Sequence, residues 1–189
     1  MKRALLLCLA VLALLGSTLP SLADAPLPPP SVVEVSSPDG SFRAVADPKK
    51  EQVVVFRHSD TAPIWSLPGW HRWFFLANDG DHLILGPDGL NLLPLQVDGS
   101  QPLIVFMRRT EKVRVVTVGE IFPGLRGLQQ TASHFAWGSI VGVSSHNQLI
   151  VELVDGRRLA FEVSTGDVAL ERGASNKALQ PTRRTAPRG

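Results

Sequence analysis

The sequence predicts an all-β protein of short antiparallel strands. Runs of β-branched and aromatic residues recur along residues 32–163, and turn sequences such as Asp-Gly separate them. The chain has 16 Gly and 15 Pro among 189 residues, which favours many turns, and its 44% hydrophobic content is enough for a packed core. These observations predict either a partial propeller-like fold or a two-sheet architecture, with one short helical segment near residues 118–129.

About a dozen short strands are expected, ten of which have clear bounds. Phe42, Ala44 and Ala46 alternate with Arg43 and Val45, and this period of two predicts one buried face. Asn78-Asp79-Gly80 is a strong hairpin signal because Asp-Gly tolerates positive φ. The expected strands are residues 32–35, 42–46, 52–57, 73–76, 82–85, 90–95, 103–107, 113–118, 149–154 and 158–163.

The helical segment is expected because Thr117 and Glu120 have the spacing of a capping box. Pro123 could open a second short turn. The alternative for this stretch is an irregular loop.

The N-terminus has the pattern of a secretory signal peptide, residues 1–23. Lys2 and Arg3 precede an apolar run at residues 4–15, which is shorter than the ~20 residues that cross a bilayer core. Cleavage after Ala23 is preferred to cleavage after Ala25, because Pro26 would follow the second site. The mature chain is therefore expected in the periplasm or outside the cell, with no stable membrane span after cleavage.

The mature chain divides into three expected regions. Residues 24–31 are a proline-rich linker, because four prolines favour an extended stretch. Residues 32–170 are the all-β domain. Residues 171–189 are a basic tail with too few apolar side chains to dock, which predicts disorder and predicts that the tail is dispensable.

Charge and cysteine content exclude several functions. Residues 24–170 hold 12 basic and 16 acidic side chains, so no nucleic-acid partner is expected. The one cysteine, Cys8, lies inside the signal peptide. The mature chain therefore offers no thiolate nucleophile and no disulfide.

A turn motif repeats within the chain. Residues 37–44, which begin Ser-Pro-Asp-Gly, match residues 77–84 in style 40 residues later. In this the chain resembles WD40- and TolB-like propeller proteins, whose blades often carry such a hairpin. The resemblance implies a propeller-like fragment of about three blades, because a closed propeller needs at least four blades of ~40 residues. Residues 70–166 also resemble a group of small secreted bacterial proteins, a resemblance that implies no activity.

Candidate binding residues come from two aromatic segments. Trp70, His71 and Trp73 lie in the first, and His134 and Trp137 lie in the second. Exposed Trp faces can stack on sugars or peptide prolines, and histidine adds hydrogen bonds. The alternative is that these rings pack in the core, which a small domain without disulfides needs.

No catalytic motif is present, and no cofactor is expected. The candidate metal ligands are His71, His82 and His134, with Asp79 or Asp81 as carboxylate partners. No pair of them has ligand spacing, so no metal site is expected. The sequence therefore predicts a secreted or periplasmic binding module for a protein, peptide or glycan. The alternative is an extracytoplasmic hydrolase with a dispersed His/Asp site. A hydroxyl, a histidine and an aspartate in one cleft would favour the hydrolase.

Overall fold

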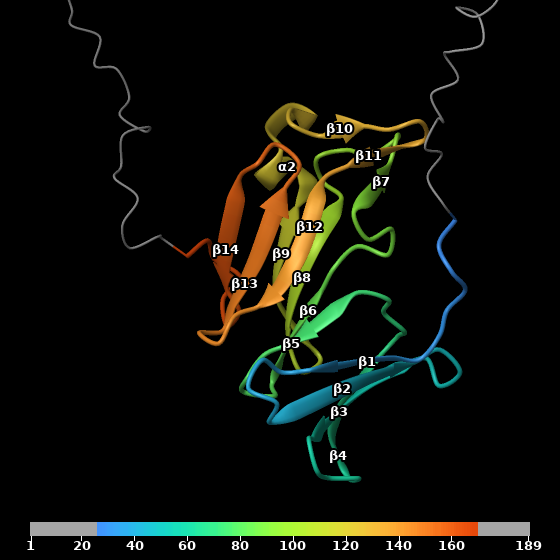
Figure 1. Cartoon of the computed structure of the whole chain (residues 1–189), viewed down its shortest axis with the longest axis vertical. Coiled ribbons are helices and arrows are strands. Elements are labelled where there is room, and N and C mark those ends of the chain that lie inside the picture. The colour runs from blue at the N-terminus through green and yellow to red at the C-terminus, as the bar shows by residue number, and fades with distance from the viewer. Residues whose placement is uncertain (1–25, 170–189) are drawn as a thin grey trace, which may run out of the picture.

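The computed structural model describes residues 26–169. These residues form four antiparallel sheets (Figure 1), which confirms the predicted fold class. The segments predicted as a signal peptide, residues 1–23, and as a tail, residues 171–189, lie outside the described residues, as does Cys8. Within residues 26–169, no helix is long and apolar enough to cross a membrane.

The first sheet is a meander of four strands in chain order. It contains β1 (Val33–Ser36), β2 (Phe42–Asp47), β3 (Gln52–Arg57) and β4 (Pro63–Pro68). The sequence did not predict β4, because it begins and ends with proline. Proline cannot donate to a strand ladder, and it is tolerated here because β4 is an edge strand.

The second sheet has the order β5-β6-β8-β9 and occupies the middle of the molecule (Figure 1). Its strands are β5 (Phe74–Leu76), β6 (His82–Leu85), β8 (Pro102–Arg108) and β9 (Glu111–Thr117). The third sheet contains β12 (Gly138–Val143), β13 (Gln148–Leu153) and β14 (Arg158–Glu162). β12 was missed from the sequence, because its two glycines hide the alternating pattern.

A small sheet interrupts this succession. It joins β7 (Leu92–Pro94), which follows β6, to β11 (His134–Ala136) and β10 (Gln129–Gln130). The strand predicted at residues 90–95 is thus shorter than expected. The segment that contains β10 and β11 lies in the chain between the last strand of the second sheet and the first strand of the third.

The second sheet is buried on both faces, and its alternating side chains divide between two cores. Phe74, Leu76, Leu83 and Leu85 pack toward the first sheet. The residues between them belong to the core shared with the third sheet, which includes Ile84, Ile104, Phe106, Leu149, Val151 and Phe161. Because side chains alternate across a strand, one sheet can hold its two neighbours together.

The three larger sheets carry equivalent tight turns. In each turn, a positive-φ residue donates its backbone N–H to a carbonyl three positions earlier. These bonds run from Gly40 to Ser37, from Gly80 to Ala77 and from Asn147 to Ser144, at 2.9, 3.2 and 3.0 Å. The 40-residue repeat predicted from the sequence therefore corresponds to a real structural repeat. The third turn was missed because it lacks the Asp-Gly pair.

The innermost strands of these sheets surround a hollow of about 240 Å³. Its lining comes from β1 with the turn that follows it, from β5 and from β12. The arrangement is a three-bladed, unclosed propeller-like fold, which decides between the two predicted architectures in favour of the propeller-like one.

The predicted helical segment is present as two short pieces. They are α2 (Val118–Ile121) and a 3₁₀ turn, η1 (Pro123–Leu125). The backbone N–H of Thr117 donates to Oε1 of Glu120 at 3.0 Å, and the Thr117 side chain contacts the backbone of Glu120 in return, so the expected capping box is confirmed. Val118 and Ile121 are buried in the core shared by the second and third sheets.

Candidate functional site

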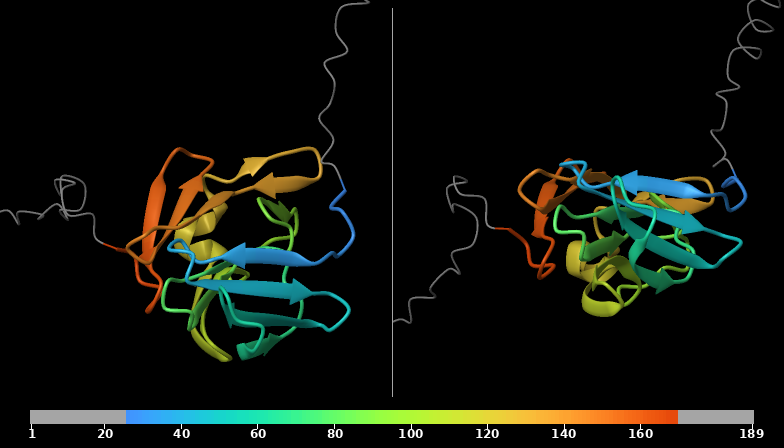
Figure 2. Two further views of the ribbon diagram at one scale, coloured as in Figure 1. Left: turned by 60° about the horizontal axis from the view of Figure 1, so that its bottom comes forward. Right: turned by 90° about the horizontal axis from the view of Figure 1, so that it is seen from below.

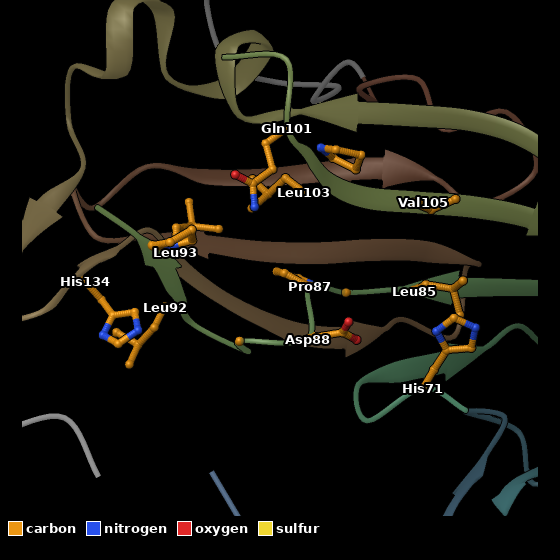
Figure 3. A pocket seen from close by; sticks show the side chains of 14 residues that line it. His71, Leu85, Pro87, Asp88, Leu92, Leu93, Gln101, Leu103, Val105 and His134 are labelled. Carbon is orange, nitrogen blue, oxygen red and sulfur yellow. The ribbon is translucent and has the colours of Figure 1, made fainter. Parts of the chain in front are cut away.

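A cleft of about 410 Å³ lies between the second sheet and the small sheet (Figure 3). Most of its walls are apolar, and its polar groups are few. Figure 3 shows His71 and His134 at opposite ends, with Asp88 between them. The apolar lining residues are Leu85, Pro87, Leu92, Leu93, Pro94, Pro102, Leu103 and Val105, and Gln101 adds an amide.

His71 lies in the short connection between β4 and β5 and is half-buried. Burial lowers the pKa of His71 below its ordinary value, and the carboxylate of Asp88 acts in the opposite direction. Because this pKa lies below the ordinary value of 6.5, the neutral imidazole predominates at pH 7. A neutral imidazole can both donate and accept a hydrogen bond at this end of the cleft.

His134 is the first residue of β11, at the tip of the β10–β11 hairpin. The hydroxyl of Thr131 accepts from the backbone N–H of His134 at 3.1 Å, and the N–H of Thr131 donates to the His134 carbonyl at 2.9 Å. Ser133 Oγ lies 2.9 Å from Nδ1 of the imidazole. These contacts fix the ring at its end of the cleft.

The predicted aromatic site is divided by the fold. Trp137 is fully buried, with 0% exposure, and its indole N–H donates to the carbonyl of Leu90 at 2.8 Å. It cannot offer a ring face to a ligand, so its assignment as a binding residue is wrong. The ring is needed to fill the core between the second and third sheets.

Trp73 packs against the same core and is half-buried. Its ring centroid lies 6.1 Å from those of Phe75 and Trp137, with tilted planes. Trp70 is half-buried at the edge of the other core, and it contacts the segment ahead of β1. Of the five predicted residues, the fold brings only His71 and His134 into the cleft.

Sequence reasoning missed the other polar groups of the cleft. Asp88 belongs to an Asp-Gly pair, which predicts only a turn, and Gln101 carries no motif. Leu92 and Leu93 were assigned to a strand without a surface role. No local signal marks these residues, because the cleft forms only where β7 approaches the second sheet.

The titratable side chains in and near the cleft bear on two alternatives, a metal site and a hydrolase. Within residues 26–169, no three His, Cys, Asp or Glu side chains are grouped to hold a metal. His82 instead places Nδ1 2.7 Å from Oδ2 of Asp79 in its own hairpin. The described lining includes two histidines and an aspartate. The hydroxyl nearest to them in the described contacts is that of Ser133, which contacts Nδ1 of His134 and is not itself among the lining residues.

Comparisons with known proteins give fold-level likenesses alone. No family model matches the chain, and no curated protein matches it. Solved structures similar to it include the RRP9 WD40 repeats, with a TM-score of 0.42, 13% identity and coverage of 77% of this chain and 39% of that one. U3-55K gives the same TM-score and identity and is covered over 40% of its length. Hydrazine synthase of Kuenenia stuttgartiensis is similar with a TM-score of 0.35 and 16% sequence identity, and the match covers 72% of this chain and 35% of that one. The chain thus spans about two fifths or less of these structures, and values this low carry no functional argument.

Proposed function

We propose that the protein is a binding module that holds an extended, apolar segment of a partner protein in the cleft between His71 and His134. The main support is the composition of the cleft, whose walls are mostly apolar and include only a few polar groups. Such a lining is typical of binding sites in which apolar contact supplies affinity and polar groups fix orientation. The separation of the histidines suits an elongated ligand.

The small sheet supports a peptide over a compact ligand. β7 lines the cleft through Leu92, Leu93 and Pro94, and it is an edge strand of its sheet. An extended peptide can place alternate side chains against such a strand and also use the backbone of its edge. Protein and peptide partners were both predicted from the sequence.

Selection from a phage-displayed dodecapeptide library tests this function. Selected peptides should be apolar at alternate positions and should lose at least tenfold in affinity toward Leu92→Glu, because a buried carboxylate would oppose them. His134→Ala should weaken binding by several-fold. Matched controls are Val154→Glu and His58→Ala, which change exposed residues outside the cleft.

Two results would contradict the proposal. One is a selected peptide that binds Leu92→Glu as tightly as the wild type. The other is a glycan array that binds the wild type and gives the same loss with Leu92→Glu, because the cleft would then be a glycan site.

We further propose that the protein acts in the periplasm or outside the cell. The support is the charged n-region, the short apolar run and the Ser21-Leu22-Ala23 cleavage sequence. Amino-terminal sequencing of the extracytoplasmic protein should begin at Asp24. A full-length form retained in the membrane fraction would contradict export by cleavage.

A further inference from the structure

The segment ahead of β1 lies against two side chains of the β4–β5 connection. The indole N–H of Trp70 donates to the carbonyl of Ser31 at 2.9 Å, and Nη2 of Arg72 donates to the carbonyl of Pro28 at 2.8 Å. The guanidinium carbon of Arg72 lies 5.0 Å from the Trp70 ring centroid, so the ring supports the cation. We call these two side chains the Trp70/Arg72 face.

The spacing of the two carbonyls matches a polyproline II helix. Pro28, Pro29 and Pro30 each have φ fixed near −65°, and a residue that precedes proline is driven to extended backbone. A polyproline II helix has three residues per turn, so the carbonyls of Pro28 and Ser31 lie on the same side. The two donors of the Trp70/Arg72 face therefore contact successive turns of one helix face.

The hydrogen-bonding groups of the two partners are complementary. Prolines offer carbonyl acceptors but no N–H, so this segment cannot join a sheet through Pro28–Pro30. The Trp70/Arg72 face contributes only donors, because an indole and a guanidinium have no acceptor. Both hydrogen bonds are accepted by main-chain carbonyls. The Trp70/Arg72 face therefore recognises the backbone conformation of the segment and not the identity of its side chains.

We propose that the Trp70/Arg72 face is a recognition site for extended proline-rich segments, and that residues 28–31 of the same chain occupy it in cis. A proline-rich segment of a partner protein with acceptors three residues apart would use the same donors after displacing this occupant. Figures 1 and 2 show the occupant running along the side of the molecule that carries the tip of the β10–β11 hairpin, before it enters β1.

This site is distinct from the cleft. His71 lies between Trp70 and Arg72 in the chain and lines the cleft, whereas its two neighbours contact the proline-rich segment. The inference therefore does not depend on the function proposed for the cleft. His134→Ala should leave proline-peptide binding unchanged.

The test uses the full chain with Pro28, Pro29 and Pro30 all changed to Gly. The probe is a fluorescein-labelled peptide, Asp-Ala-Pro-Leu-Pro-Pro-Pro-Ser-Val, and the readout is fluorescence anisotropy. An occupant tethered by a short connection has an effective concentration on the order of millimolar, so the triple variant should bind at least about tenfold more tightly than the wild type. The same peptide with its prolines replaced by glycine should not bind.

Trp70→Phe in the triple variant keeps an aromatic ring but removes the indole N–H, and it should weaken peptide binding at least fivefold. Arg72→Gln should weaken it similarly. In NMR spectra of ¹⁵N-labelled protein, the Trp70 indole resonance should shift in the triple variant and return when the peptide is added. The proposal would be overturned if the triple variant did not bind the peptide. It would also be overturned if Trp70→Phe left peptide binding unchanged, or if the Trp70 indole resonance of the triple variant did not move when the peptide was added.

Discussion

The backbone N–H of Asn78 donates to Oδ1 of Asn147 at 2.9 Å, although the two residues are 69 positions apart. In the same way, the N–H of Asp39 donates to Oδ1 of Asn78 at 3.0 Å. The equivalent turns of the three larger sheets are thereby linked in succession, from the first through the second to the third. This chain of bonds fixes the sheets around the hollow between β1, β5 and β12.

The first prediction concerns this link. Asn147 has φ of 56°, a conformation that glycine also adopts, so Asn147→Gly should remove the side-chain bond without strain in the turn. The expected loss is about 1 kcal/mol of unfolding free energy, the usual worth of such a bond. Urea denaturation measures it. An unfolding free energy unchanged by Asn147→Gly would contradict the link.

The second prediction concerns the close approach of Gly86 to Trp73. A Cβ added at Gly86 would lie 2.8 Å from Cε3 of the Trp73 ring and 3.2 Å from Cδ1 of Ile140. Gly86→Ala should therefore destabilise the protein by about 1–3 kcal/mol through overpacking. In a Trp73→Leu background the same change should cost much less, because the obstructing ring is gone. An equal cost in both backgrounds would show that the ring is not the obstacle.

The third prediction compares two tryptophans. Trp73→Ala should cost about 3–5 kcal/mol, because a ring packed between Phe75 and Trp137 leaves a cavity. Trp70→Ala should cost less, about 1–2 kcal/mol, because this ring lies at the edge of its core and its main polar contact is one hydrogen bond. Urea melts of both variants decide the ranking. Equal, large losses would assign Trp70 to the core and count against a binding role for it.

The fourth prediction concerns pH. Because burial lowers the pKa of His71, the folded protein binds fewer protons at this residue than the unfolded chain. Stability supplied by the neutral ring is present above the unfolded value of about 6.5, and it is lost as the pH falls through that value toward the lower folded pKa. The difference in unfolding free energy between the wild type and His71→Gln should therefore decrease from pH 7.5 to pH 5.5. The exposed His58 gives a matched control as His58→Gln. A difference that stays constant with pH would contradict the assignment.

The sequence by itself determined the features that depend on neighbouring residues. Alternation in Phe42–Ala46, the Asp-Gly turns and the Thr117–Glu120 pair act within a few positions, so the β class, most strands, two of the equivalent turns and the short helix could be predicted. The strands β4 and β12 pair with sequence neighbours and were missed for a local reason, because prolines and glycines hide their patterns. The tertiary structure alone decided what depends on contacts across long separations. It placed Trp137 in a core, brought His71 and His134 to one cleft, seated Pro28 and Ser31 on Arg72 and Trp70, and linked the turns at Asn78 and Asn147. The hydrogen bonds among these contacts join residues 39 to 69 positions apart, where local composition does not specify a partner and only the packing of whole sheets does.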